Sequence, residues 1–324
     1  MGGRREREVL LEKRIESKLE TLPSVMSEYY YSMIGSGKTY DTAYKYICNV
    51  ALFLDYMFKG KCDEKFYLKV KSVHINKYIT SLRTKDVNGK AERTSDSFRS
   101  TSWSALNSFF QFLVPEYIDV NPVSYTTRPK MKDNPSVTYL TADETKGLLK
   151  NVEVNASLRN KNRDLCILKL GFATGLRVSA IVQIDINDID FENNRIRVTE
   201  KGDYDNYVMF GENLKAQILL WMNDRSKYFD TKKSDALFVT QYGERMSANA
   251  VRELVKKYSV GVTNKKITPH VMRHTCATNL YEKTGDIYLC AKQLNHKNVT
   301  TTQRYAEISN KKQREAANTL DDLI

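Results

Sequence analysis

Apolar positions in the first third of the chain recur three and four residues apart, the spacing of one face of an α-helix. Turn-forming segments such as GSGK and KDVNGK interrupt this spacing. The pattern therefore predicts helices over residues 24–34, 39–58, 72–83 and 95–114. Residues 1–20 alternate acidic and basic side chains without an apolar face, which predicts a solvated helix or arm.

A change of composition divides the chain. The segment NPVSYTTRPKMKDNPS holds three prolines and several positive charges, which is typical of an interdomain linker. We therefore expect a charged N-terminal helix or arm (1–20), a helical domain (21–116), a linker (117–136), a second domain (137–309) and a C-terminal tail helix (310–324).

The second domain contains both the helical and the strand spacing of apolar residues. Thr141 and Glu144 form a capping box, so a helix begins there. Over residues 188–210 the apolar period becomes two, which predicts short strands in DIDFENN, RIRVTEKG and DYDNYVMF, and DALFVT is a further candidate strand. Helices are predicted over residues 140–152, 163–175, 176–184, 212–229, 247–258, 268–285, 286–295 and 300–308. The predicted fold class is mainly α, with a small antiparallel β-sheet in the C-terminal domain.

The charge of the chain suggests a partner. The net charge is +12, and residues 59–100 alone carry eleven Lys and Arg against five Asp and Glu. A basic protein of this size is expected to meet a polyanion such as nucleic acid, the alternative being a solvated surface. The five cysteines are scattered without a CxxC, which disfavours a disulfide framework or a cysteine-rich zinc site. No apolar run has the length of a membrane span, so we expect a cytoplasmic protein.

The segment TPHVMRHTCATNL holds two of the four histidines around one arginine. Thr268 is a good N-cap and Pro269 suits the first helical position. His270 and Arg273 then lie one turn apart at the N-terminus of a helix, whose free N–H groups favour an anion such as phosphate. Taken alone, this segment is better interpreted as a capped amphipathic helix with a surface arginine and no ligand.

Other segments add candidate residues. Arg177 follows a Thr-Gly turn in ATGLRVSAI, Lys201 lies at the tip of a predicted strand hairpin, and His296 precedes Tyr305 by nine residues. Each has a structural alternative: a surface cap, a turn lysine, a polar C-cap and one tyrosine among twenty. His74 and His274 have no such context and are interpreted as structural.

Taken in order, these segments are specific. TGLR, the KGD turn, HVMRHTCAT and LNHKNVTTTQRYA resemble the arginine box, lysine turn, His-x-x-Arg box and tyrosine box of the tyrosine recombinase (integrase) family. The resemblance implies that Tyr305 attacks a DNA phosphodiester and forms a 3′-phosphotyrosine, without a cofactor or a metal. Arg177, Arg273 and His296 would bind the phosphate, and Lys201 would protonate the leaving 5′-oxygen. His270 would act near Tyr305 as a general base or as an orienting residue.

Two positions depart from the family pattern. The family usually has an acidic residue three positions after the first arginine, where this chain has Ala180. Asn295 replaces the usual glycine before His296, which is a mild change because asparagine tolerates a left-handed backbone. The aspartates of DINDID (185–190) could suggest a metal site, but a solvated turn is the better interpretation.

The resemblance also implies an architecture and partners. Family members form a two-domain clamp on double-stranded DNA with inverted-repeat core sites. They recombine through a Holliday junction as a tetramer, with a tail that docks on the neighbouring protomer. Accessory DNA-bending proteins are further partners of such enzymes, and the nucleoid is their place of action. Lys77, Arg93 and Arg99 are our candidates for DNA contact in the helical domain.

Two other functions remain open at this stage. A type IB topoisomerase uses similar chemistry, and a DNA-binding regulator could keep the fold with a silent site. The biological programme is also open, whether integration of a mobile element, inversion or resolution of chromosome dimers.

Overall fold

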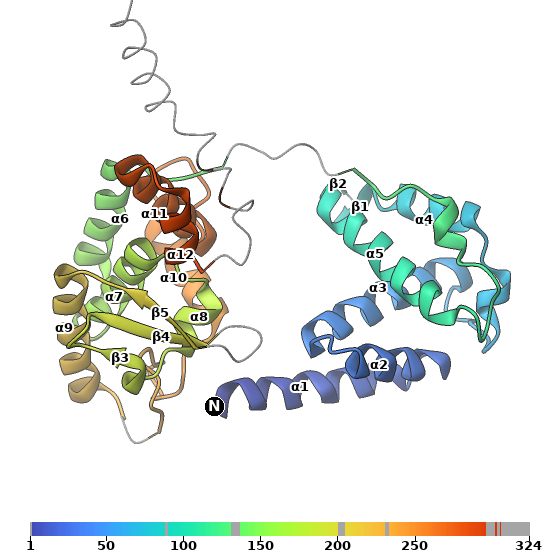
Figure 1. Ribbon diagram of the computed structural model, residues 1–324, viewed down its shortest axis with the longest axis horizontal. Coiled ribbons are helices and arrows are strands. Elements are labelled where there is room, and N and C mark those ends of the chain that lie inside the picture. Colours follow the sequence, from blue (N-terminus) through green and yellow to red (C-terminus); the bar gives the residue numbers. More distant parts are fainter. Residues whose placement is uncertain are drawn as a thin grey trace, which may run out of the picture. The chain divides into compact units, whose positions relative to one another are not determined.

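The computed structural model describes residues 2–87, 90–130, 137–199, 205–230, 233–295, 302 and 305. The chain divides into two compact units, Met1–Pro135 and Ser136–Ile324 (Figure 1). Each unit has its own core of buried side chains. The fold class is the predicted one, mainly helical with a small antiparallel sheet in the second unit.

The first unit consists of helices and one strand pair. Its elements are α1 (Gly2–Leu19), α2 (Val25–Gly35), α3 (Tyr40–Phe58), η1 (Phe66–Lys69), α4 (Ser72–Ser81), β1 (Thr84–Val87), β2 (Lys90–Arg93), α5 (Asp96–Leu113) and η2 (Pro122–Tyr125). Its core is rich in aromatic rings: Phe109 stacks on Phe66 and meets Tyr29 edge to face. Such aromatic pairs bury large apolar surfaces and fix the helix contacts.

The N-terminal helix departs from expectation. Helix α1 packs against α3, and Ile15 is fully buried within the aromatic core. Leu19 packs against the same core. The expectation that residues 1–20 lack an apolar face is therefore wrong. The dense charges around these residues obscured a face that only a few apolar side chains form.

A strand pair also replaces a predicted turn. Strands β1 and β2 pair antiparallel, with Val87 opposite Lys90. The intervening Asn-Gly pair, which is favoured in tight hairpins, is the sequence signal for this pairing. The sequence prediction took KDVNGK as a simple turn because its flanks are charged rather than alternately apolar.

The beginning of the predicted linker packs on the first unit. Val123 is fully buried in its core. The Trp103 indole donates a hydrogen bond to Thr126 (2.8 Å), and the Arg128 side chain donates one to Ser100 (2.9 Å). These contacts tie residues 121–128 to α5 and leave less of the chain to connect the two units.

The second unit combines a three-stranded sheet with helices (Figure 1). Its elements are α6 (Ala142–Asn155), α7 (Leu158–Thr174), α8 (Val178–Gln183), η3 (Ile186–Asp188), β3 (Ile189–Asp190), β4 (Arg195–Thr199), β5 (Asp205–Met209), α9 (Glu212–Tyr228), α10 (Ala248–Ser259), α11 (Pro269–Thr284) and α12 (Ile287–Gln293). The strand order is β3-β4-β5 and all pairs are antiparallel. Helix α7 packs against both α9 and α11.

Two local predictions have definite outcomes. The capping box at α6 is confirmed, because the Thr141 hydroxyl accepts from the Glu144 amide and the Glu144 carboxylate accepts from the Thr141 amide. The candidate strand DALFVT forms isolated bridges instead, pairing Ala236 with Asp185 and Val239 with Arg245. The segment is buried, and the fully buried Trp221 donates its indole hydrogen to the Leu237 carbonyl.

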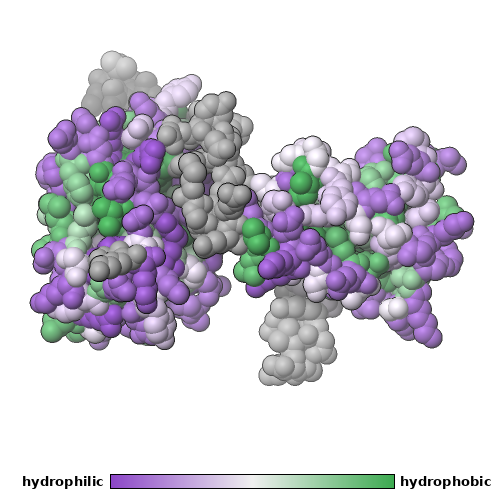
Figure 2. All heavy atoms as spheres, turned by 90° about the horizontal axis from the view of Figure 1, so that it is seen from below, coloured by the Kyte–Doolittle hydropathy of each residue, from purple (hydrophilic) through white to green (hydrophobic). Residues whose placement is uncertain are grey.

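The surface is mostly hydrophilic. Figure 2 shows hydrophilic residues over much of the visible face, with separate smaller hydrophobic areas. None of the helices in the described part of the chain has the length and hydropathy needed to cross a membrane.

Candidate active site

The site is organised by the N-terminus of α11. Thr268 caps the helix by accepting a hydrogen bond from the Val271 amide, and Pro269 occupies the first turn, as predicted. Val271 and Met272 are buried in the core of the unit. Gly171 of α7 permits this packing, because a Cβ there would lie 2.3 Å from the Met272 methyl carbon. The rotation of α11 that buries these side chains also sets the direction of Arg273.

Arg273 is buried, with 4% of its surface exposed. Its guanidinium donates to the Gly175 carbonyl at 2.6 Å and to the Leu294 carbonyl at 2.7 Å. These bonds join the end of α7 to the end of α12 and hold the guanidinium plane in one orientation. The surface arginine of the ligand-free alternative is therefore not what the structure contains.

The Gly175 turn requires glycine for two reasons. Its φ of +65° lies in the left-handed region, and a Cβ there would lie 2.5 Å from the Leu294 side chain and 3.2 Å from the Cys276 sulfur. The turn ends α7 and directs the chain into Arg177, the exposed N-cap residue of α8. The Gly175 turn thus supplies a carbonyl to Arg273 and is followed two residues later by a second arginine, Arg177.

His270 lies among positive charges. Partial burial, together with the nearby charges of Arg273, Arg177 and Arg252, lowers the pKa of His270 below its usual 6.5. The imidazole is therefore mainly neutral at pH 7, and the region around it favours an anion. Arg252, exposed on α10, was missed by sequence reasoning because only the packing of α10 against α11 brings it here.

Tyr305 is buried, with 1% of its surface exposed. It packs in a small cluster with Ala277, Leu294 and Val137. Its hydroxyl lies 2.8 Å from Nδ1 of His274, and the two ring centroids are 5.7 Å apart. The sequence interpretation took His274 as a structural residue without special context, and the structure places it in direct contact with the Tyr305 hydroxyl.

A signal for His274 was present in the sequence. His270 and His274 are four residues apart in a helix, so their side chains share one face. Their rings lie 6.5 Å apart in a stacked arrangement. The missing information was the position of Tyr305, which depends on a tertiary contact rather than on α11 itself.

Asn295 has the left-handed backbone conformation that its asparagine permits, with φ of +52°. Its side-chain oxygen accepts a hydrogen bond of 2.5 Å from Asn206 of β5, so the end of α12 is tied to the sheet. Two predicted site residues, Lys201 before β5 and His296 after Asn295, lie outside the described residues. The predicted tail at 310–324 also lies outside them.

Ala180 lies in α8, at the position where the family usually has an acidic residue. Ala180 is partly buried and packs against the apolar core of the second unit. A methyl group there contributes to packing, so the site lacks a carboxylate from this position.

The candidate DNA contacts of the first unit differ in environment. The Lys77 side chain is exposed on α4. Arg99 is largely covered and forms an ion pair of 2.7 Å with Asp96, one turn earlier in α5. The backbone of Arg93 ends β2, but its side chain lies outside the described part of the structure. A phosphate could reach Lys77 directly, whereas at Arg99 it would compete with the Asp96 carboxylate.

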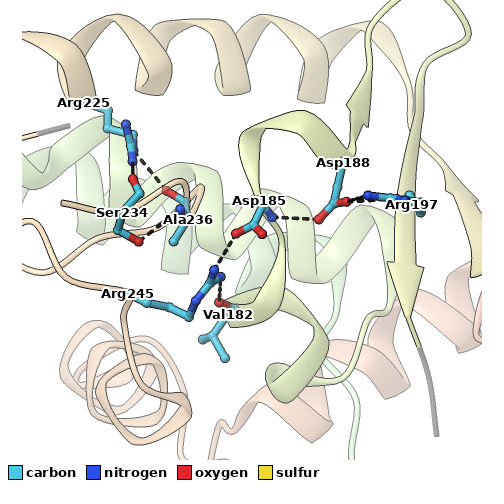
Figure 3. A network of polar contacts seen from close by, with 8 residues as sticks. All are labelled: Val182, Asp185, Asp188, Arg197, Arg225, Ser234, Ala236 and Arg245. Carbon is cyan, nitrogen blue, oxygen red and sulfur yellow. Dashed lines mark hydrogen bonds and ion pairs between the residues drawn. The ribbon is translucent and has the colours of Figure 1, made fainter. Parts of the chain in front are cut away.

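The aspartates of DINDID bind arginines. Asp185 pairs with Arg245, Asp188 with Arg197 at 2.7 Å (Figure 3), and Asp190 with Arg195 at 2.8 Å. Hydrogen bonds from Asn193 and Arg195 also lower the pKa of Asp190 to about 2. Each of these carboxylates has an arginine partner, and the described residues contain no cluster of three or more groups suited to a metal ion.

Comparison with known sequences defines the class. Residues 138–312, more than half of the chain, match the Phage integrase family. The chain therefore belongs to the phage integrase family and is a site-specific tyrosine recombinase, an enzyme that cuts and rejoins DNA strands.

Individual relatives cover nearly the whole chain. The tyrosine recombinase XerS of Streptococcus gordonii is 28% identical over 356 residues, covering 97% of this chain and 99% of the relative. XerS of Streptococcus thermophilus strain CNRZ 1066 is 28% identical over 362 residues, covering 98% and 99%.

Solved structures share the fold. The XerH recombinase bound to a palindromic difH substrate has a TM-score of 0.67 and 21% identity, covering 88% of this chain and 81% of that one. The Tn1549 transposon integrase with circular intermediate DNA has a TM-score of 0.65 and 20% identity, covering 88% and 95%.

Proposed function

We propose that this recombinase exchanges strands between two copies of an inverted-repeat DNA site, with Tyr305 as the nucleophile. The observation that carries the proposal is the arrangement around α11. Arg273 is held by two carbonyls, Arg177 and Arg252 lie near His270, and the Tyr305 hydroxyl contacts the same helix through His274. Positive charge and a phenol therefore lie along the first two turns of one helix, an arrangement that suits phosphoryl transfer.

The arginines would stabilise the transition state. Negative charge grows on the non-bridging oxygens of the phosphate when Tyr305 attacks, and a guanidinium presents its donors in a planar fork that matches two oxygens. Because the carbonyls of Gly175 and Leu294 already orient Arg273, little reorganisation is needed at the moment of reaction. Arg177, an exposed residue whose charge acts on His270, would bind the same phosphate.

The leaving group requires a proton. Attack by Tyr305 forms a bond from its oxygen to phosphorus and breaks the bond to the 5′-oxygen, leaving a 3′-phosphotyrosine. We assign protonation of the 5′-oxygen to Lys201 and a further phosphate hydrogen bond to His296, on the family pattern. The freed 5′-hydroxyl of the partner duplex then attacks the phosphotyrosine, so the energy of the original bond is retained and no cofactor is consumed.

The partners follow from the same assignment. Solved relatives include XerH on a palindromic difH substrate and a lambda integrase tetramer on a Holliday junction. By analogy we propose a tetramer on paired sites, with the two units of each protomer clamping one half-site and Lys77 among the residues that contact the backbone. Such an enzyme would work in the cytoplasm at the nucleoid. Resolution of chromosome dimers and integration of a mobile element both remain consistent with these relatives.

Trapping of the covalent intermediate tests this proposal. Duplexes from a randomised pool are selected for binding to the wild-type protein, and a nick beside the cleavage position turns the selected site into a suicide substrate. The wild-type protein should give a protein–DNA adduct on a denaturing gel, also in EDTA, and Tyr305→Phe should give none. Tyr242→Phe, at an exposed tyrosine of the same unit, is the matched control and should react normally. An adduct that persists in Tyr305→Phe would refute the proposal.

The C-terminal tail has its own test. We propose that residues 310–324 dock on a neighbouring protomer, because Ala316, Ala317, Leu320 and Ile324 recur at roughly helical spacing. Truncation after Asn310 should preserve binding to a half-site and reduce tetramer assembly and strand exchange. Unchanged strand exchange by the truncated protein would reject this role.

A further inference from the structure

His274 offers chemistry that the family pattern does not assign. It lies on α11 one turn after His270, and its Nδ1 is 2.8 Å from the Tyr305 hydroxyl oxygen. The rings of His270, His274 and Tyr305 follow one another, with successive centroids 6.5 Å and 5.7 Å apart. His274 therefore contacts the atom that attacks the phosphate, from the helix whose first turn binds that phosphate in our proposal.

Burial makes this contact significant for the reaction. A phenol has a pKa near 10, so at neutral pH it reacts well only if a base removes its proton as the bond to phosphorus forms. Tyr305 is only 1% exposed, so bulk water is poorly placed to take this proton. Nδ1 of His274 is already within hydrogen-bonding distance and can accept it when Nε2 carries the ring hydrogen.

Packing alone does not account for the histidine. Tyr305 packs against the apolar side chains of Ala277, Leu294 and Val137 as well as against the His274 ring, so part of its burial does not depend on the imidazole. His274 is only partly buried and directs a ring nitrogen, rather than a carbon edge, at the phenolic oxygen. An apolar side chain of similar size could fill the same volume, which makes the two roles separable by substitution.

We propose that His274 is a further catalytic residue, the base that accepts the Tyr305 proton. This inference rests on the proposed function of Tyr305. In the cleavage step, the Tyr305 oxygen bonds to phosphorus, its hydrogen passes to Nδ1 of His274, and the phosphorus–5′-oxygen bond breaks with its electron pair on the 5′-oxygen. That oxygen takes a separate proton from the general acid. In the rejoining step the 5′-hydroxyl attacks phosphorus and gives its proton to the deprotonated general acid, while the phosphorus–tyrosine bond breaks and His274 returns its proton to the departing Tyr305 oxygen.

Three substitutions separate the proton acceptor from a packing residue. His274→Phe keeps the ring volume without an acceptor. His274→Asn places an amide oxygen near the position of Nδ1, where it can accept a hydrogen bond but cannot take up a proton. His274→Ala removes both. Asn279→Ala, at an exposed position of the same helix, is the matched control. The single-turnover rate of adduct formation is measured on the nicked selected duplex, with thermal unfolding and duplex affinity measured in parallel.

We expect all three His274 variants to form adduct about 10²–10⁴ times more slowly than the wild-type protein, the usual range for loss of a general base. His274→Phe and His274→Asn should keep the wild-type duplex affinity and unfolding temperature, and Asn279→Ala should react normally. Wild-type rates in His274→Asn would show that a hydrogen bond suffices, and wild-type rates in His274→Phe would show that none is needed. Either result overturns the proposal, as does a loss of affinity or folding that accounts for the whole loss of rate.

A modified duplex distinguishes the base from the general acid. Replacing the bridging 5′-oxygen by sulfur gives a leaving group that departs without protonation. The defect of His274→Phe should persist on this duplex, whereas the defect of Lys201→Ala should be relieved. Relief of both defects would assign His274 to the leaving group and overturn its role as base. Failure of the proposed function is recognised separately, because the wild-type protein would then form no adduct at Tyr305.

Discussion

Two buried arginines of the second unit have nearly the same bonding but different surroundings. Arg273 is 4% exposed and donates to the carbonyls of Gly175 and Leu294. Arg225 of α9 is 3% exposed and donates to the carbonyls of Ser234 and Ala236 (Figure 3). Each guanidinium closes a loop onto a helix, so both contribute to the stability of the fold.

Their electrostatic neighbours distinguish them. Burial lowers the pKa of Arg225, and the nearby carboxylate of Asp235 opposes this shift. Arg273 instead contributes, with Arg177 and Arg252, to the positive charge that lowers the pKa of His270. Buried arginines bonded to carbonyls are thus not in themselves a sign of catalysis. Their function follows from whether the surrounding charge attracts a protein carboxylate or an external anion.

Matched substitutions should separate the two arginines most strongly. Arg273→Lys keeps the charge but loses the fork, so adduct formation should fall about 10²–10³-fold, as when one transition-state donor is removed. Arg225→Lys should leave this rate nearly unchanged. Each should lower the free energy of unfolding by about 1–3 kcal/mol, because a buried carbonyl loses its donor. Single-turnover adduct formation and chemical denaturation measure the two effects, and equal rate losses in both variants would remove the distinction.

The turn that holds Arg273 should be the next most sensitive. Gly175→Ala combines left-handed strain with overlap against Leu294, so we expect a destabilisation of about 2–4 kcal/mol. Gly261 also has a left-handed φ, of +77°, but a Cβ there meets nothing within 4 Å. Gly261→Ala should therefore cost only about 1–2 kcal/mol of strain. Denaturant titration compares the two, and a cost at Gly175 no larger than that at Gly261 would contradict the close packing around Arg273.

A smaller effect on stability is expected at Glu144, which anchors the segment before α11. Glu144 accepts hydrogen bonds from Lys265 (2.6 Å) and Thr263 (2.6 Å), and with the Thr141 amide these lower its pKa from 4.5 to about 2. Because the folded-state pKa lies below the unfolded one, the stabilisation is complete above pH 4.5 and is lost as the pH falls towards 2. Glu144→Gln should cost about 1 kcal/mol at pH 7 and progressively less in acid. A difference from the wild-type protein that stays constant between pH 7 and pH 3 would contradict this role.

The smallest effect concerns His270. The pKa of His270 in the free protein should lie below 6.5. It should rise towards 6.5 when Arg252→Gln removes one positive neighbour. The corresponding substitution of Arg245, which already pairs with Asp185, should leave the His270 titration unchanged. NMR titration of the imidazole measures both, and a His270 pKa that does not rise in Arg252→Gln would contradict the contribution of Arg252 to the lowered pKa.

Local signals made much of the site predictable from the sequence. The Thr268 cap, the Pro269 position and the left-handed Asn295 depend on nearby residues, and the structure contains all three. The apolar periods likewise predicted the four longer helices of the first unit that follow α1. The family resemblance rested on four short motifs. Their order along the chain identified the family without any knowledge of their positions in the fold.

Tertiary contacts explain what sequence reasoning missed. The burial of Ile15 depends on α3, the approach of Arg252 depends on how α10 packs, and the contact of His274 depends on where Tyr305 comes to lie. A histidine four residues from another is compatible with many functions until a partner is placed beside it. Charge-rich segments were the least predictable, because the few apolar side chains that pack α1 on the core, Ile15 and Leu19 among them, are separated by charged residues.

Mapping the residue joined to DNA tests the central claim most directly. The adduct formed by the wild-type protein on the nicked selected duplex is digested with protease and nuclease, and the peptide that carries the nucleotide remnant is sequenced by mass spectrometry. The account predicts a phosphodiester link at Tyr305, with the remnant on its hydroxyl oxygen. A remnant on any other residue would contradict the assignment of Tyr305 as nucleophile and, with it, the role proposed for His274.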